Sequence, residues 1–419
     1  MIQYALYNAL LALASPPARL WLSRSRHAAL LARFSPECPP GARGGLWVHA
    51  CSVGEVNTIA PLIRLWRTRH PETPVLLTVS TETGMAQAAR AYPELPVCWL
   101  PFDTAAGVRR FARALAPRAL VLTETEIWPN LVRETRRMGL PVIVVNGRIS
   151  PRQYPAYWRM RWFVRPVFAG LSAVGVQNSE YGERFMALGA RPESVTVTGN
   201  LKFDAVTTEP DAMTRLQYRV ECGYGPDDRV LLFGSTRPGD EELARHCLGH
   251  LRESMPDLRV IIAPRHPQRL AEAMAPFAGV PVTLRSDIKS GKTNKAGPVM
   301  FLDTMGELSN FYALATVAVI GGSFFPGVNG HNPLESAGLG VATVYGPFMG
   351  NFPEASAALL ARNGAVQTSS GELPGVLGQL LGDARACRAL GTLGRKALLE
   401  NQGAAERNLL LIESLLTGG

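Results

Sequence analysis

Short apolar runs rich in β-branched residues recur along the chain, and segments with helical periodicity lie between them. Such runs are typical of buried strands, and their alternation with helices predicts parallel sheets covered by helices on both faces. A first set of runs spans 46–50, 75–80, 97–100, 119–123, 142–146, 174–177 and 195–198. A second set spans 230–233, 260–263, 280–284, 300–302, 317–320 and 342–345. The pattern therefore predicts an α/β protein with two sheets.

Two domains are expected because a single hydrophobic core stops growing near about 250–300 residues, and this chain has 419. The polar stretch 207–211 is the natural boundary. We expect a helix with a basic flank over 1–26, a first domain over 27–206, and a second domain over 207–419 that the C-terminal helices close. Ligands bind beyond the carboxyl ends of parallel strands. Two doubly wound, Rossmann-like domains are therefore expected to face each other across a ligand-binding cleft.

Composition excludes several classes of protein. Hydrophobic residues make up 47% and charged residues 18%, which excludes a disordered chain, a collagen and a coiled coil. A mean hydropathy of +0.04 excludes a polytopic membrane protein. The six cysteines lie far apart without a Cys-x-x-Cys pair, so we expect free, mostly buried thiols rather than disulfides or a zinc site.

The net charge of +9 is concentrated in two basic stretches, 1–50 and 133–165. The second holds eight arginines against one acidic residue, Glu134, and tyrosine and tryptophan residues alternate with them. Arginines with interfacial rings suit an anionic membrane surface, and Arg159, Arg161 and Arg165 are the candidates for contact with an acceptor or membrane. A solvated basic face and stacking of single-stranded nucleic acid are the alternatives.

The N-terminal 18 residues are apolar and uncharged, and a basic run begins at Arg19. A secretory signal carries its positive charge before the apolar stretch, not after it. The stretch is shorter than the ~20 residues that cross a bilayer, and Pro16-Pro17 is expected to interrupt its helix. We expect a helix associated with the membrane, with the arginines on lipid phosphates. An ordinary buried first helix is the alternative.

Six motifs in one order through nearly the whole chain carry a resemblance to a known family. They are Ser52-Val53-Gly54-Glu55, Glu124-Thr125-Glu126-Ile127-Trp128-Pro129-Asn130, Leu201-Lys202-Phe203-Asp204, Pro264-Arg265-His266-Pro267, Met305-Gly306-Glu307-Leu308 and Gly330-His331-Asn332-Pro333-Leu334-Glu335. The sequence resembles the 3-deoxy-D-manno-octulosonic acid (Kdo) transferases. The resemblance implies the two-domain GT-B fold and transfer of Kdo from CMP-Kdo to a lipid A precursor, lipid IV(A), in lipopolysaccharide core biosynthesis. It also implies an N-terminal anchor at the cytoplasmic face of the inner membrane.

Three residues are implied to carry the chemistry. Inverting sugar transfer needs a base for the acceptor hydroxyl, and the family's base falls on Glu55. Its transition-state positions fall on Glu124 and Lys202, where a lysine suits a developing phosphate charge. Taken alone, Glu55 is equally a carboxylate that complements a helix dipole, and Lys202 a surface cation. No Asp-x-Asp motif occurs, and a CMP-sugar carries a single phosphate, so neither a metal nor a cofactor is expected.

The donor CMP-Kdo is expected in the second domain. The candidate residues supply cations, an open glycine backbone and a helix start: Arg265, His266, Met305, Gly306, Glu307, Asn332, Pro333, Leu334 and Glu335. The alternative for the last four is a capping arrangement without a ligand. Two details depart from the family pattern, since Arg237 stands where a histidine is expected and 324–329 is less rich in glycine.

Three other functions are alternatives to Kdo transfer. A sugar-nucleotide epimerase shares the GT-B fold but needs no membrane anchor. A two-domain sugar-binding protein is usually exported, and the N-terminus is not a signal peptide. Nucleic-acid binding through 133–165 predicts an affinity that falls steeply with salt.

Overall fold

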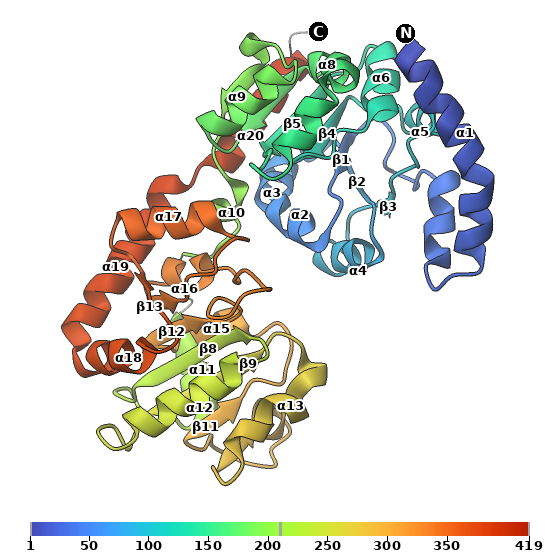
Figure 1. Ribbon diagram of the computed structural model, residues 1–419. Helices are drawn as coiled ribbons and strands as arrows, with labels where there is room; N and C mark the ends of the chain where they lie inside the picture. Colours follow the sequence, from blue (N-terminus) through green and yellow to red (C-terminus); the bar gives the residue numbers. More distant parts are fainter. Residues whose placement is uncertain (1, 209–211, 418–419) are drawn as a thin grey trace. The chain divides into compact units, whose positions relative to one another are not determined.

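The computed structural model describes residues 2–208 and 212–417, which form two compact units (Figure 1). The first unit comprises Met1–Ala205 together with Gln402–Gly419, and the second comprises Val206–Asn401. The expected boundary stretch ends at residues 209–211, which lie outside the described residues. The second domain was expected to run to residue 419, but the structure returns the segment after Asn401 to the first unit.

The first unit is built on a seven-stranded parallel sheet in the order β3-β2-β1-β4-β5-β6-β7. Each of the seven predicted runs forms a strand. The strands are β1 (Leu46–His49), β2 (Val75–Val79), β3 (Val97–Trp99), β4 (Ala119–Thr123), β5 (Val142–Gly147), β6 (Ala173–Val176) and β7 (Val195–Val197).

Both faces of this sheet are covered, as the apolar runs predict. Trp47 and Leu120 pack with Phe111 and Phe168 on one face, while alternate strand residues such as Val48 pack into a second core on the other. The helices of the unit are α1 (Ile2–Ser23), α2 (Val53–Thr58), α3 (Ala60–Arg69), α4 (Glu82–Ala91), α5 (Ala105–Leu115), α6 (Pro129–Arg137), α7 (Tyr154–Arg159), α8 (Arg161–Ala169), α9 (Ser179–Ala187), α10 (Leu201–Asp204) and α20 (Ala404–Thr417), with 3₁₀ turns η1 (Ala28–Phe34) and η2 (Pro192–Ser194).

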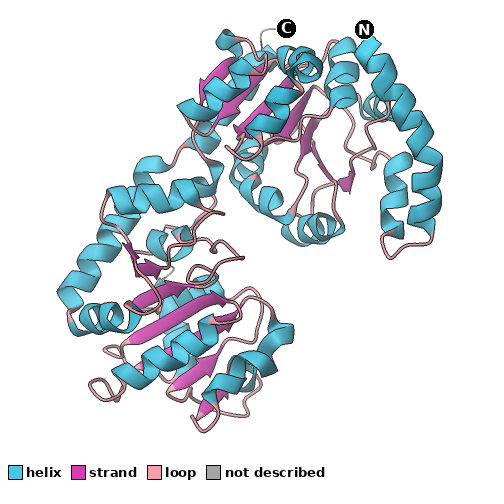
Figure 2. Ribbon diagram, in the orientation of Figure 1, coloured by secondary structure: helices cyan, strands magenta, loops and turns pink. Residues whose placement is uncertain are grey.

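The second unit repeats the arrangement with a parallel sheet in the order β10-β11-β9-β8-β12-β13-β14 (Figure 2). The strands are β8 (Val230–Thr236), β9 (Arg259–Pro264), β10 (Val282–Leu284), β11 (Val299–Phe301), β12 (Val317–Ile320), β13 (Ala342–Tyr345) and β14 (Val366–Gln367). Six match predicted runs, and the two-residue edge strand β14 was not predicted. Its helices are α11 (Ala212–Cys222), α12 (Asp240–Leu251), α13 (Leu270–Met274), α14 (Arg285–Lys289), α15 (Leu308–Tyr312), α16 (Leu334–Gly338), α17 (Pro353–Ala361), α18 (Leu373–Gly382) and α19 (Ala384–Asn401), with 3₁₀ turns η3 (Pro267–Arg269) and η4 (Ala275–Phe277). The expected doubly wound α/β fold is thus confirmed for each unit.

Helix α20 belongs to the first unit because its apolar stripe packs there. Buried Leu409 and Ile412 join the core that covers one face of the sheet. Asp204 holds the start of the helix, since its carboxylate accepts hydrogen bonds from the backbone N–H groups of Gly403 (2.7 Å) and Ala405 (2.6 Å). The sequence predicts that this helix is amphipathic, but it does not indicate which of the two sheets buries the apolar side of the helix.

Helix α1 continues through Pro16 and Pro17 to Ser23, so the expected interruption does not occur. The two prolines remove donors to backbone carbonyls that lie on an exposed part of the helix, where water can bind them. Exposed apolar side chains include Leu13 (75% exposed) and Trp21 (63% exposed). Within residues 2–208 and 212–417, no helix combines the length and apolar character needed to cross a membrane.

Candidate active site

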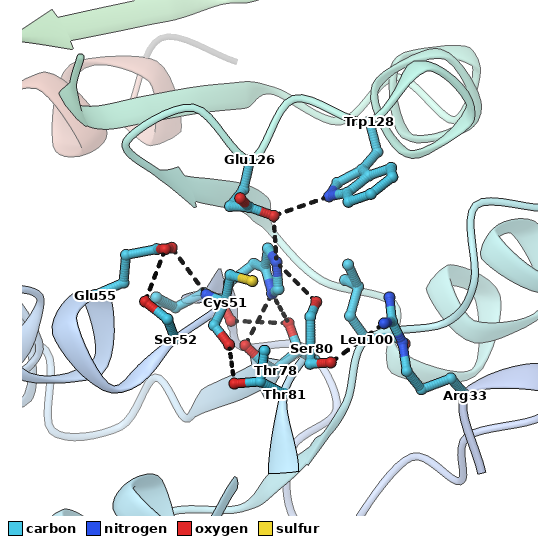
Figure 3. A network of polar contacts seen from close by, with 12 residues as sticks. Arg33, Cys51, Ser52, Glu55, Thr78, Ser80, Thr81, Leu100, Glu126 and Trp128 are labelled. Carbon is cyan, nitrogen blue, oxygen red and sulfur yellow. Dashed lines mark hydrogen bonds and ion pairs between the residues drawn. The ribbon is translucent and has the colours of Figure 1, made fainter. Parts of the chain in front are cut away.

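The carboxyl ends of β1 and β4 carry the central carboxylates of the first unit, and the two strands are neighbours in the sheet. After β1 the chain turns at Ser52 into α2, which places Glu55 in the first turn of that helix. The Glu55 carboxylate accepts hydrogen bonds from the backbone N–H of Cys51 (2.8 Å) and from the Ser52 hydroxyl (3.1 Å) (Figure 3). These bonds fix the carboxylate at the edge of the sheet where ligands bind in such folds.

The surroundings of Glu55 raise the pKa of its carboxyl to about 8. Burial is the largest cause, because it disfavours the charged form. The hydrogen bonds from Cys51 and Ser52 oppose this shift, while the negative charges of Glu126 and Glu124 add to it. A carboxyl with a pKa near the working pH is suited to take a proton.

Glu126 is held on the opposite side of the site by two ring nitrogens. Trp128 donates its indole N–H to Glu126 (3.1 Å), and His49 Nε2 lies 3.7 Å from the same oxygen, Oε2 (Figure 3). Burial opposes ionisation of Glu126, but the interactions with His49, Trp128 and Cys51 outweigh it and lower its pKa. Glu126 is therefore the ionised member of the pair and Glu55 the member that titrates.

Glu124 follows β4 directly and adopts a left-handed backbone conformation with φ of 56°. Its backbone N–H donates to the Val145 carbonyl (3.0 Å), so the strained residue is held by the neighbouring strand β5. Positive φ is unfavourable for a residue with a side chain and is concentrated at functional sites. The negative charge of Glu124 contributes to the raised pKa of Glu55. The two predicted site residues therefore lie close enough to interact electrostatically.

Lys202 lies in the short helix α10, which is tied to the same edge of the sheet. The backbone N–H of Leu201 donates to the side-chain carbonyl of Asn146 (2.9 Å), which ends β5, and the Lys202 N–H donates to Asn200 (3.0 Å). Lys202 is half-buried. The three predicted catalytic residues therefore belong to one edge of one sheet.

Cys51 lies between the two carboxylates. Its thiol sulfur and one oxygen each of Glu55 and Glu126 are all within 4.8 Å of one another. Burial raises the pKa of the thiol to about 12, with smaller contributions from Glu126 and Glu55. Among the described residues these three are the group whose geometry could hold a metal ion.

Three of the eight arginines of 133–165 line one cavity of the first unit. Arg159, Arg161 and Arg165 line a hollow of about 530 Å³ together with Trp158 and Trp162. The Arg161 guanidinium lies 4.7 Å from the Trp158 ring centre. Tryptophan side chains here are 41% and 62% exposed, so the cavity presents cations and rings together.

Helix α1 packs beside this cavity. The rings of Tyr4 and Tyr7 lie 6.0 Å and 5.5 Å from that of Phe163 in α8, and Arg133 stacks over Tyr4 at 4.4 Å. The two basic stretches of the sequence are therefore in contact through Tyr4, Tyr7, Arg133 and Phe163.

In the second unit, positive side chains gather where β8, β9 and β12 end. The backbone N–H of Arg265 donates to the Thr236 carbonyl (3.1 Å), which fixes the end of β9 against β8. Burial and the charges of Arg237, Arg265 and Arg269 lower the pKa of His266. Burial, Arg265, Arg237 and His266 lower that of His331 to about 4. Such a cluster of cations is suited to an anionic ligand.

A helix begins in the predicted motif, although Pro333 and not Asn332 occupies the position directly before it. The Asn332 side chain accepts a hydrogen bond from the Leu334 N–H (3.1 Å) and donates to Glu335 (3.3 Å). Pro333 precedes the first helical residue of α16. Burial raises the pKa of Glu335, opposed by Asn332 and by the nearby charge of Arg265. Arg265, His266, Asn332 and Glu335 are therefore brought together.

Glu307 has other partners. It accepts hydrogen bonds from Tyr218 (3.0 Å), Arg285 (3.1 Å) and Thr304, and Lys289 lies 3.5 Å away. With its acceptor sites so occupied, this carboxylate ties its own loop to α11 and α14. Gly306 has φ of 84° with open space beside its Cα, and Met305 is 59% exposed. The backbone at Gly306 stays accessible, as expected for this motif.

Several residues of the two clusters were not among the predicted site residues. His49, Cys51 and Glu126 surround Glu55, and Arg237 and His331 join the cationic cluster. The first four end or follow strands, so the strand-end rule contained a signal for them, whereas His331 lies in the loop between β12 and α16. Cys51 in particular was expected to be an inert buried thiol, but it is only half-buried and lies in the site. Cys38 and Cys98 are also only half-buried, whereas Cys222, Cys247 and Cys387 are buried as expected.

A family model and a curated sequence that resemble this chain both carry the same description. Residues 20–205 match the family model described as "3-Deoxy-D-manno-octulosonic-acid transferase (kdotransferase)". The 3-deoxy-D-manno-octulosonic acid transferase of Bordetella pertussis is 33% identical over 397 residues, which cover 92% of this chain and 90% of that protein.

Comparison with solved structures identifies the fold. A glycosyltransferase from Rickettsia africae matches with a TM-score of 0.60 and 9% identity over 89% of this chain and 97% of the other. A UDP-GlcNAc 2-epimerase from Neisseria meningitidis matches with a TM-score of 0.59 and 12% identity over 89% and 100%. At such identities the likeness establishes the architecture alone, a GT-B-like pair of α/β units.

Proposed function

The chain belongs to the Kdo transferase family of glycosyltransferases, and on that premise we propose that it transfers Kdo from CMP-Kdo to a lipid A precursor, lipid IV(A), with inversion. The observation that carries this proposal is the state of the Glu55 carboxyl. It is half-buried and held by two hydrogen bonds, and its pKa is raised to about 8. Such a group is suited to the one proton transfer that the reaction requires.

In the proposed step the acceptor hydroxyl attacks the anomeric carbon of Kdo from the face opposite the CMP phosphate. The new C–O bond forms as the bond from the anomeric carbon to the phosphate oxygen breaks, and CMP leaves with that electron pair. Glu55 takes the hydroxyl proton. The carboxylate of Glu124 stabilises positive charge at the anomeric carbon, and the ammonium of Lys202 stabilises negative charge on the phosphate. No metal and no cofactor is assigned a part in this step.

The donor is assigned to the cationic cluster of the second unit. Arg265 and His266 bind its phosphate, Glu335 accepts from ribose hydroxyls, and Met305-Gly306 offers an open backbone. Asn332, Pro333 and Leu334 form the start of α16 that orients Glu335. Support comes from the guanidinium groups of Arg237 and Arg265, which lie close enough to His266 and His331 to lower the pKa of both. An anion would neutralise the positive charge of these arginines.

The acceptor is assigned to the basic, aromatic cavity of the first unit. Lipid IV(A) carries phosphates on a sugar pair whose acyl chains lie in a bilayer. Arg159, Arg161 and Arg165 with Trp158 and Trp162 offer cations and interfacial rings for such a headgroup. With the exposed apolar residues of α1 beside them, these residues form a membrane-facing surface, and we assign the protein to the cytoplasmic face of the inner membrane.

The test is incubation with CMP-Kdo and a tetraacyl lipid A precursor, with the products weighed by mass spectrometry. Glu55→Gln should slow transfer about 10²–10⁴-fold while CMP binding stays unchanged. Glu82→Gln is a matched control, because Glu82 also lies in the first turn of a helix. If Glu55→Gln retains activity within a few-fold of the wild type, Glu55 is not the base.

An epimerase of the same fold was the nearest alternative. The likeness to the Neisseria meningitidis epimerase extends over the fold at 12% identity, whereas the sequence relationship to the Bordetella pertussis transferase is far closer. The acceptor-dependence of product formation separates the two activities, because an epimerase needs no lipid.

A further inference from the structure

We propose that Cys51, Glu55 and Glu126 form a binding site for a borderline-soft divalent cation, Zn²⁺, and that the bound ion switches off the transferase by occupying Glu55. The binding site rests on geometry alone. Its inhibitory effect rests on the proposed function of Glu55 as the base.

The three ligand atoms come from three separate places in the first unit. Cys51 follows β1, Glu55 lies in α2, and Glu126 follows β4. Their sulfur and oxygen atoms lie within 4.8 Å of one another. Ligands in a tetrahedral zinc site stand roughly 3.3–3.8 Å apart, given bond lengths of about 2.0–2.3 Å. Small side-chain rotations therefore suffice to close the three atoms around one ion, with a fourth position left for water.

A second set of groups holds these ligands in position, as is typical of metal sites. The Cys51 N–H and the Ser52 hydroxyl bond to Glu55, and Trp128 bonds to Glu126. His49 is fully buried, with its Nδ1 2.9 Å from the Thr78 carbonyl. Since a carbonyl only accepts, this nitrogen is the donor, and the ring is thereby fixed with Nε2 toward Glu126.

The charges of the site also suit a dication. One thiolate and two carboxylates carry −3 when all are ionised. Arg33 contributes +1, since its guanidinium is fixed by the carbonyls of Leu100 (3.0 Å) and Ser80 (3.2 Å) and interacts electrostatically with Cys51 and Glu126. Glu124, whose negative charge also acts on Glu55, adds −1. The sum of −3, +1 and −1 is −3, most of which one Zn²⁺ neutralises. The Cys51 sulfur favours Zn²⁺ over Mg²⁺, which prefers oxygen ligands.

Binding displaces protons and blocks catalysis. The Cys51 S–H bond and the Glu55 O–H bond break, two protons leave to solvent, and bonds from sulfur and oxygen to the ion form. The Glu55 lone pair that would accept the acceptor hydroxyl proton is then bound to the cation. Zn²⁺ should therefore inhibit transfer, and chelation should restore it.

The experiment measures metal binding directly. The full chain, purified metal-free, is dialysed against Zn²⁺ or Mg²⁺ and its metal content is determined, and Co²⁺ is used as a spectroscopic probe of sulfur ligation. We expect one Zn²⁺ per chain, no stoichiometric Mg²⁺, and a Co²⁺ absorption band characteristic of thiolate coordination. Cys51→Ser should weaken Zn²⁺ binding more than about 10-fold, since even loss of outer groups costs 10–100-fold. Cys98→Ser, which changes a half-buried cysteine at β3, is the matched control.

Each outcome decides one of the two claims. Absence of stoichiometric Zn²⁺, or binding that survives both Cys51→Ser and Glu126→Gln, overturns the site. Thermal unfolding of each variant identifies any loss of binding that comes from misfolding, and the Glu126→Gln variant keeps the proposal testable if Cys51→Ser does not fold. Zn²⁺ that binds at this site without inhibiting transfer would leave the site intact and instead remove Glu55 from the role of base.

Discussion

Replacement of Glu126 by glutamine should move the pH dependence of the transferase to lower pH. Glu55 must be ionised to accept a proton, so kcat/KM should rise with pH through the pKa of Glu55, which lies at about 8. Glu126 is ionised and contributes to that raised pKa. Removing its charge makes Glu55 easier to ionise, and the midpoint of the rise should fall.

The size of the shift follows from the separation of the two carboxylates. Their oxygens lie within 4.8 Å, so the repulsion is at least about 0.9 kcal/mol in a water-like medium and about 3.5 kcal/mol at an effective dielectric constant of 20. At 1.36 kcal/mol per pKa unit, this corresponds to a shift of about 0.6 to 2.5 units. Glutamine keeps a carbonyl oxygen for the Trp128 N–H, so the local packing is retained.

The assay is kcat/KM for CMP-Kdo transfer between about pH 5.5 and 9.5, measured for both proteins at one ionic strength. The midpoint is the readout, because the plateau also reflects any direct contribution of Glu126 to binding. Glu94→Gln serves as a control, since Glu94 is an exposed carboxylate paired with Arg67. A midpoint that is the same in Glu126→Gln and in the wild type would refute the electrostatic argument.

Three further outcomes are expected. Arg265→Ala should weaken CMP binding by about 1.5–3 kcal/mol, as loss of a charged hydrogen bond does. Arg252→Ala, which changes an exposed arginine of the same unit, should leave CMP binding unchanged. If calorimetry gives Arg265→Ala the same CMP affinity as the wild type, the donor site is not at Arg265. Asp204→Ala removes both bonds to the start of α20 and should lower the free energy of unfolding by about 0.5–2 kcal/mol; an unchanged urea midpoint would contradict this. Reversal of the three cavity arginines to glutamate should raise the KM for the lipid and reduce binding to anionic vesicles, with about 1 kcal/mol for each lost cation, and the corresponding lysine variant should change little.

The strands could be predicted from the sequence because their residues are buried on both faces. A run such as 142–145 is apolar throughout, and only a central parallel strand removes all of its side chains from water. The edge strand β14 has two residues, one of them exposed, so no apolar run marks it. The proline pair in α1 was expected to interrupt the helix, but exposed backbone carbonyls that lose an N–H donor to proline can bind water instead.

Neighbours in the site were harder to predict than the site's position. The strand ends could be placed on one edge of a sheet, which brought Glu55 and Glu124 together. Which side chain of a pair turns inward depends on local backbone geometry, as with Glu124 at positive φ and Glu126 toward His49. The internal partners of Glu307 could likewise not be read from its motif, because Tyr218 and Arg285 reach it from distant parts of the chain.

The return of α20 to the first unit makes the second unit an insertion within the first. A ribosome completes residues 46–205 well before it makes the helix that covers one face of their sheet. At about 5–20 residues per second, the roughly 200 intervening residues take roughly 10–40 s to synthesise. During that interval the apolar positions that meet Leu409 and Ile412 remain open to solvent. We therefore expect the nascent first unit to expose apolar surface, the kind of surface that chaperones bind, until α20 emerges.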